Sequence, residues 1–194
     1  PRCRRDLEEL AGCLALTALR PSGRQGRVRR RFLSAVTPEG LSFCTETAAA
    51  VCGRVYVLED SYGLAPALLQ RVLEQALQLG QTCLVCYTPL QPDGAPAHLL
   101  VPGAGAAFVA SSPDFPYAGE RCCTLELDGT LPPAARDTLH FARDTAGTLL
   151  RKAAEHVREA KRIHDELEAL CRPYVDFAAA DALTERTLHE LFPA

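Results

Sequence analysis

The sequence predicts an α/β protein with a three-layer core, a mostly parallel sheet and a long helical C-terminal third. Val55–Leu58 and Thr82–Tyr87 are short apolar runs of the kind found in buried parallel strands. Helical patterns alternate with such runs as far as Leu127, which is typical of α/β folds. From Pro132 onward, apolar residues recur three and four positions apart over about nine turns of helix.

The N-terminal part is predicted to be a helical, arginine-rich arm or connector over residues 1–31, ahead of a domain over residues 32–194. The whole chain has a net charge of −3. Residues 1–31 hold nine arginines and three acidic residues, a charge of +6, so residues 32–194 carry a charge of −9. Gly23–Arg31 offers a surface for phosphate or for an acidic partner, and a solvated arm is the alternative.

The other elements follow the apolar periodicity and the turn residues. We expect helices over 5–20, 41–52 and 177–192, and strands over 32–36, 99–101, 106–110 and 122–127, the last at a sheet edge. Residues 132–194 form the helical part, either as one long helix or as two helices that separate near Gly147. Its regular apolar seam extends further than one small sheet is expected to cover.

The centre of the chain combines a strand, a short loop and a helix. The strand is predicted over Val55–Leu58, Pro66 starts the helix, and Gly80 ends it. This is the frame of a P-loop, in which backbone amides at a helix N-terminus cradle phosphate. The loop is expected to be a vestigial, non-functional phosphate loop comprising Asp60, Ser61, Tyr62, Gly63, Leu64, Ala65, Pro66 and Ala67.

The chemistry of a P-loop is missing from this frame. When G-x-x-x-x-G-K-[ST] is laid over the loop, Asp60 and Ala65 take the places of its two glycines. Pro66 replaces the lysine, and Ala67 replaces the hydroxyl residue that would hold Mg²⁺. Gly63 stands at a position that the motif leaves open.

The cysteines and histidines predict no metal site. Nine cysteines without a signal peptide indicate reduced thiols in a cytoplasmic protein. Cys83 and Cys86 form a C-x-x-C within a predicted strand, where positions i and i+3 face opposite sides. The five histidines follow no metal-ligand spacing, and no apolar run is long enough to span a membrane.

Three separated segments of the chain carry a resemblance to a known family. They are Arg29–Gly40 (RRRFLSAVTPEG), the strand, loop and helix around residues 55–80, and the C-terminal segments Lys161–Glu168 and Tyr174–Phe177. Together they resemble a bacterial family of tandem P-loop ATPase-like proteins, which has Arg-His-Leu-Phe-Ala-Ser-Ala-Ile-Thr-Pro-x-Gly at the first segment and its Walker A motif at the second. The resemblance covers about residues 29–192 and implies a RecA-like or kinase-like P-loop fold, with the chain corresponding to one half of the tandem protein.

The sequence departs from the family wherever the family would act. Besides the changes in the loop, Cys86–Pro92 lacks the His, Cys and Asp of the family's Tyr-His-Cys-Pro-x-Asp-Pro. Ala110–Ser112 stands where an acidic, Walker-B-like magnesium anchor is expected after the strand near Phe108. These three losses predict a pseudoenzyme.

The leading expectation is therefore a catalytically inactive P-loop NTPase-like scaffold or partner-binding subunit. We expect no catalytic residue, no metal and no tightly bound cofactor, although ATP with magnesium fits the implied ancestry. A protein partner or a second copy is expected to bind the C-terminal helices, with no membrane contact. The alternatives are a weak nucleotide sensor or ATPase-like protein with a non-standard phosphate loop, and a nucleic-acid-binding module that uses the arginine-rich arm.

Overall fold

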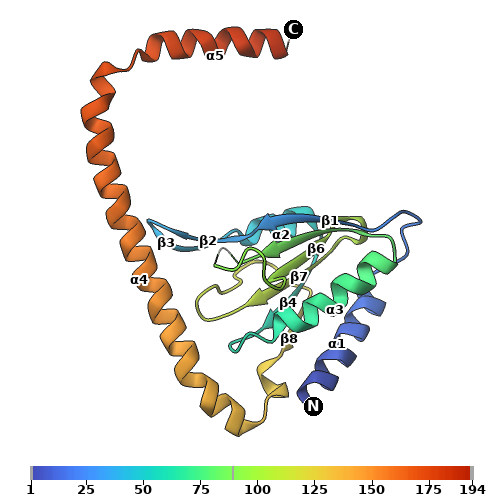
Figure 1. Cartoon of the computed structure of the whole chain (residues 1–194). Coiled ribbons are helices and arrows are strands. Elements are labelled where there is room, and N and C mark those ends of the chain that lie inside the picture. The colour runs from blue at the N-terminus through green and yellow to red at the C-terminus, as the bar shows by residue number, and fades with distance from the viewer. Residues whose placement is uncertain (1, 89, 193–194) are drawn as a thin grey trace.

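In the computed structural model, residues 2–88 and 90–192 are described. The helices are α1 (Arg2–Ala18), α2 (Thr45–Val51), α3 (Ala65–Gln78), α4 (Pro133–Cys171) and α5 (Phe177–Leu191). The strands are β1 (Arg27–Phe32), β2 (Ser34–Thr37), β3 (Gly40–Phe43), β4 (Arg54–Glu59), β5 (Thr82–Tyr87), β6 (His98–Val101), β7 (Ala106–Ser111) and β8 (Cys123–Glu126). Figure 1 shows the sheet and its helices as a body, with α4 and α5 extending away from it.

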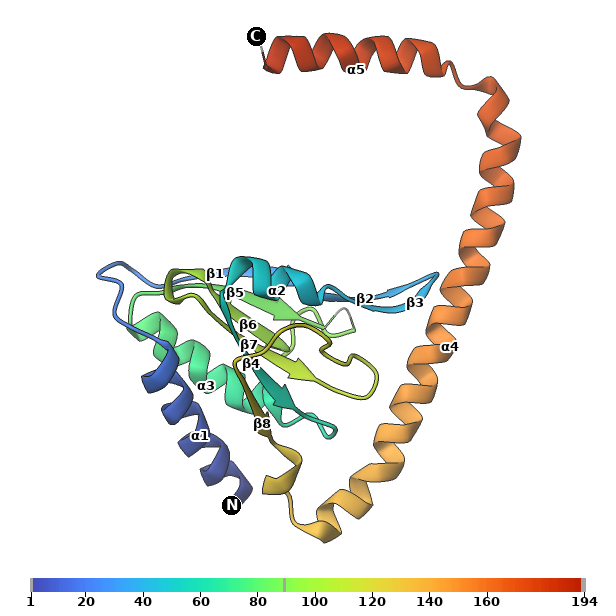
Figure 2. The same ribbon diagram turned by 180° about the vertical axis from the view of Figure 1, so that it is seen from behind.

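The main sheet has six strands in the order β1-β5-β6-β7-β4-β8. Of these, β6 alone runs antiparallel to its neighbours, so the predicted mostly parallel α/β sheet is confirmed. An apolar strand such as Val55–Leu58 is expected at the centre of the sheet, but β4 lies second from one edge, with only the short strand β8 beyond it. The carboxyl ends of the parallel strands point toward α4 (Figure 2).

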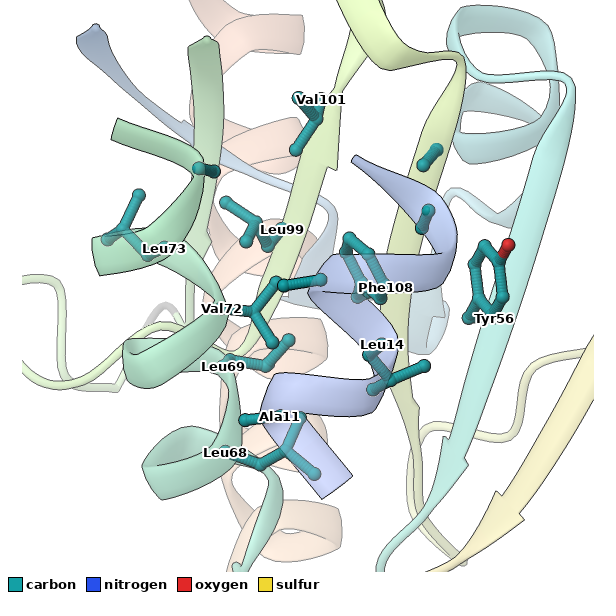
Figure 3. Packing of buried hydrophobic residues seen from close by; sticks show 14 of the residues in the cluster. Ala11, Leu14, Tyr56, Leu68, Leu69, Val72, Leu73, Leu99, Val101 and Phe108 are labelled. Carbon is teal, nitrogen blue, oxygen red and sulfur yellow. The ribbon is translucent and has the colours of Figure 1, made fainter. Parts of the chain in front are cut away.

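Helices cover both faces of this sheet. On one face, α1 and α3 pack on a cluster that includes Val72, Leu99 and Phe108, and the rings of Tyr56 and Phe108 stack with centroids 5.2 Å apart (Figure 3). On the other face, α2 contributes Ala48 to a second cluster. Strand β4 contributes to both clusters, because successive side chains of a strand point to opposite faces of the sheet. Tyr56 and Leu58 lie in the first cluster, and Val55 and Val57 lie in the second.

The N-terminal residues belong to this α/β body. Leu7, Ala11 and Leu14 of α1 are buried in the core beside α3. Residues 27–31, expected to be part of the arm, form edge strand β1 together with Phe32, in parallel register with Thr82–Tyr87 of β5. The boundary drawn between residues 31 and 32 therefore falls inside a strand.

Two further predictions near β1 are wrong in detail. The strand expected over 32–36 is the end of β1 followed by β2, and the helix expected over 41–52 is β3 followed by the shorter α2. The cause is an antiparallel hairpin in which Ser34 pairs with Phe43 and Thr37 with Gly40. This pairing satisfies backbone groups that a helix starting at residue 41 would have used.

Helix α4 is a single helix of 39 residues that runs through Gly147 without a break. Its first half lies along the carboxyl edge of the sheet, and it then passes the β2–β3 hairpin, where Arg158 Nε donates to the Pro38 carbonyl at 2.9 Å (Figure 2). Every residue from 155 to 192 is exposed. Within residues 2–88 and 90–192, no helix combines the length and apolarity that a membrane crossing requires.

Candidate functional site

The loop between β4 and α3 closes around the side chain of its own first residue. Oδ1 of Asp60 accepts the backbone N–H groups of Tyr62 at 3.2 Å and Leu64 at 2.9 Å, and Oδ2 accepts that of Ala65 at 2.7 Å. Asp60 is 6% exposed, so this carboxylate lies inside the loop. It satisfies amides at the start of α3 that would otherwise lack partners.

A second carboxylate, from outside the loop, accepts another of its backbone amides. The Ser61 N–H donates to Oδ1 of Asp128 at 2.9 Å, from the turn that follows β8. Gly63 has a φ of +77°, a conformation that favours glycine and lets the chain turn back toward Asp60. Pro66 lies in the first turn of α3 and has no N–H to offer. The loop thus holds two carboxylates where a P-loop would hold phosphate.

A cavity of about 380 Å³ opens beside this loop, at the carboxyl ends of β4, β5 and β7. The predicted loop residues Asp60, Ser61, Tyr62, Gly63 and Pro66 line one side, whereas Leu64, Ala65 and Ala67 lie outside the lining. The remaining walls come from the ends of the strands, from residues 112–115 and from α4. Crevices at the carboxyl ends of parallel strands are common ligand sites in α/β proteins.

His98, the first residue of β6, lies at this cavity and is 4% exposed. Its ring stacks on Phe43 of the β2–β3 hairpin with centroids 4.9 Å apart. Its Nδ1 accepts the Ala110 N–H at 3.2 Å. Burial lowers the pKa of His98 to about 4, so the ring is neutral at neutral pH.

Sequence reasoning missed His98 and Ser34 as site residues. His98 directly precedes an apolar run and was therefore recognisable as the first residue of a strand. The first residue of a strand lies where the strand meets the loops, which is where a site can form. Ser34 is 6% exposed and also lines the cavity, but nothing in its sequence context distinguishes it from any other serine of a predicted strand.

Asp114 joins the loop after β7 to helix α4. Its Oδ1 lies 3.4 Å from Nη1 of Arg151, and the carboxylate covers Gly147. Arg143, on the cavity side of the same helix, is engaged with Asp144 through Nε at 3.0 Å. Asp114 and Arg143 therefore supply the charges on the α4 side of the cavity.

Serines occupy the position at which the sequence resemblance implies an acidic magnesium anchor. Ser111 ends β7, and its buried hydroxyl accepts the Tyr117 N–H at 3.2 Å. Ser112 Oγ accepts the Phe115 N–H at 3.2 Å. Both hydroxyls therefore stabilise the turn that carries Asp114.

The C-x-x-C cysteines lie apart, as their spacing predicts. Cys83 is buried in the cluster under α1 and α3, and Cys86 in the cluster under α2. Burial raises the pKa of each thiol to about 12, which disfavours the thiolate that binds metal. On the surface of α4, ligand atoms of His164, Asp165 and Glu168 lie within 4.8 Å of one another, but Lys161 Nζ already binds Asp165 at 2.7 Å.

The fold and this site together define an α/β protein with a ligand-sized cavity at the carboxyl edge of its sheet. Comparison of the chain with known protein families, with curated proteins and with solved structures finds no match in any of the three.

Proposed function

We propose that the chain is a catalytically inactive P-loop NTPase-like domain that acts as a scaffold or partner-binding subunit. The observation that carries the proposal is the Asp60 carboxylate, which accepts three backbone amides of the loop that would face a phosphate. A phosphate entering this loop would have to displace a buried negative charge from its hydrogen bonds. Its own charge would also be repelled, by about 4 kcal/mol at 4 Å and an effective dielectric of about 20.

The surroundings of the loop support P-loop ancestry. Strand β4 leads directly into the loop, and α3 follows it with Pro66 in its first turn. Strand β4 pairs in parallel with β7 on one side and with β8 on the other, so the loop lies at the carboxyl edge of parallel strands. The antiparallel direction of β6 departs from a fully parallel sheet.

The residues in and around the loop support the absence of catalysis. ATP hydrolysis on a P-loop needs a lysine on the phosphates, a hydroxyl on Mg²⁺ and an acidic magnesium anchor. Pro66 and Ala67 supply neither the lysine nor the hydroxyl. No acidic residue stands at the end of β7, where the serine hydroxyls accept backbone N–H groups of the following turn.

A partner-binding role is supported by the C-terminal arm, which we define as residues 155–192. Large apolar side chains of this arm are exposed: Val157, Ile163, Leu167, Leu170, Tyr174, Val175, Phe177, Leu183, Leu188, Leu191 and Phe192. Leu167 and Leu170 are 59% and 72% exposed on the predicted seam. Contiguous exposed apolar surface of this kind marks protein interaction sites.

Phosphate release from ATP with magnesium is the direct test. The purified chain should release no more phosphate than a heat-denatured sample. The quadruple variant Asp60→Gly, Ala65→Gly, Pro66→Lys, Ala67→Ser should recover nucleotide binding in calorimetry, because β4 and α3 still frame the loop, but not hydrolysis. Turnover that copurifies with the unmodified chain and disappears when Gly63 is changed would contradict the proposal.

Two binding measurements separate the alternatives. Binding of ATP by the unmodified chain without hydrolysis would favour a nucleotide sensor. Salt-dependent binding of a generic oligonucleotide would favour a nucleic-acid-binding module. In the structure, one of the arginines on which that module would rely, Arg30, already pairs with Asp93 at 2.8 Å and lies over the Tyr87 ring.

A further inference from the structure

The cavity at the carboxyl edge is lined by two nearly buried residues, each with a polar atom that has no hydrogen-bond partner among the described residues. Nδ1 of His98 accepts the Ala110 N–H, so the neutral ring carries its proton on Nε2, which is then a hydrogen-bond donor. Over residues 2–88 and 90–192, no acceptor pairs with Nε2 and no group pairs with the Ser34 hydroxyl.

These two groups must reach open space. Every side-chain nitrogen or oxygen that is sealed from solvent in the described part of the chain has a hydrogen-bond partner. An unpaired Nε2 on a residue 4% exposed, and an unpaired Oγ on one 6% exposed, must therefore face an opening, and the cavity is the opening that both residues line. Ser34 pairs in the hairpin with Phe43, on which His98 stacks, so the two groups share one wall.

The charges around the cavity disfavour an anion. Asp60 and Asp114 both line it, whereas Arg143, the cation on its wall, is bound to Asp144. His98 is neutral because burial lowers its pKa. A carboxylate or phosphate would therefore meet the carboxylates of Asp60 and of Asp114, the latter paired with Arg151, while the one lining cation among the described residues is already paired with Asp144.

The rest of the wall is largely apolar. Pro66, Phe115, Leu139 and Ala142 contribute to it, from the loop, the turn after β7 and α4. A volume of about 380 Å³ lies within the range of small-molecule sites, which are lined mostly by apolar groups and oriented by a few polar ones. It accommodates an aromatic ring with a polar substituent.

We propose that this cavity binds an uncharged, largely apolar small molecule whose carbonyl-type acceptor receives a hydrogen bond from Nε2 of His98 and whose second polar atom pairs with Ser34. This inference goes beyond the proposed scaffold function and does not depend on it. A chain without phosphate-loop chemistry retains the cavity, and the tests below use neither nucleotide nor magnesium.

Three probes of one size distinguish the chemistry: benzamide is neutral with an acceptor, benzoate is charged, and toluene has no acceptor. The full chain is titrated with each while the His98 ring signals are followed by NMR. Benzamide should produce a saturable shift, and benzoate and toluene should bind at least tenfold more weakly. The proposal is overturned if benzamide causes no saturable shift up to its solubility limit, or if benzoate binds as well as benzamide.

Variants locate the binding. His98→Phe keeps an aromatic ring against Phe43 but removes the donor, and should weaken benzamide binding at least tenfold, as followed by calorimetry or by neighbouring methyl signals. Ala142→Trp fills the cavity from α4, where residue 142 is exposed, and should abolish binding even if His98→Phe does not fold. Thr145→Trp, exposed on the same helix and outside the lining, is the matched control and should bind normally. Retained binding in Ala142→Trp would overturn the assignment.

Discussion

The carboxylate of Asp114 lies directly against Gly147, so that a Cβ added at position 147 would be 2.9 Å from Oδ1 and 3.0 Å from Oδ2. Glycine inside a helix normally costs about 1 kcal/mol relative to alanine. Here its lack of a side chain lets the turn after β7 approach α4 closely enough for the Asp114–Arg151 ion pair to form. This contact joins the first half of α4 to the turn after β7.

The first prediction concerns this contact. Gly147→Ala should fail to give the usual helix stabilisation while Asp114 is present, because the new methyl group displaces the carboxylate. In an Asp114→Ala background the same change should stabilise the chain by about 1 kcal/mol. Urea unfolding of the four chains of this double-mutant cycle measures the coupling. Equal stabilisation in both backgrounds would show that Asp114 simply rotates away.

Replacing Asp60 should destabilise the fold. Asp60→Ala leaves the amides of Tyr62, Leu64 and Ala65 without their acceptor and should lower the free energy of unfolding by about 2–4 kcal/mol. Asp60→Asn keeps one acceptor oxygen and should lose about half as much. Chemical denaturation provides the measurement, and a loss below about 0.5 kcal/mol for Asp60→Ala would contradict the role of this carboxylate.

Asp60→Gly should also make the loop sensitive to anions. With the carboxylate gone, amides at the start of α3 become available to phosphate. Millimolar inorganic phosphate should raise the Tm of Asp60→Gly more than chloride at the same ionic strength does, and should leave the Tm of the unmodified chain unchanged. The same phosphate response in both chains would rule out the loop as its origin.

The stability of the protein should fall as the pH drops below 6.5. The pKa of His98 is about 4 in the folded chain and 6.5 when unperturbed, so between these values the unfolded state binds a proton that the folded state does not. Stability from this group is full above pH 6.5, decreases toward pH 4, and loses about 3 kcal/mol at most. Urea unfolding between pH 7.5 and 4.5 measures this loss, and His98→Gln should flatten the profile over that range. An unchanged slope in the variant would assign the pH dependence to other groups.

The C-terminal arm should be dispensable for folding and required for association. A chain ending at residue 158 retains the Arg158–Pro38 contact and should unfold within about 0.5 kcal/mol of the full chain, because the residues it lacks are exposed where the structure describes them. The full-length variant Ile163→Glu, Leu170→Glu should lose any self-association or partner binding seen by light scattering. Lys152→Glu, on the same helix but outside the arm, is the control for added charge. Association that survives the double variant would place the interface elsewhere.

The sequence was sufficient to predict the helices and strands whose buried residues follow a regular apolar pattern. Strand β4, helix α3, strand β5 and the long α4 lie within a few residues of their predicted ranges, because strands buried on both faces and amphipathic helices carry a local signal. Pro66 and Gly80 marked the ends of α3 for equally local reasons, and Gly80 adopts a φ of +75°.

The elements defined by distant partners could not be predicted. All residues of β1 are exposed and most are arginines, so the strand has no apolar period, and its pairing with β5 joins segments about 50 residues apart. The same holds for the site. The sequence identifies Asp60 as unsuited to phosphate binding, but only the folded loop shows that its carboxylate accepts three backbone amides of the same loop.

Strand β1 has a consequence for colloidal behaviour. An edge strand exposes unpaired backbone groups and invites the edge of another molecule to add to the sheet. In β1 the exposed arginines 27, 29, 30 and 31 would bring like charges together if two copies joined along this edge. The arginines of this strand therefore oppose the pairing of two copies along β1.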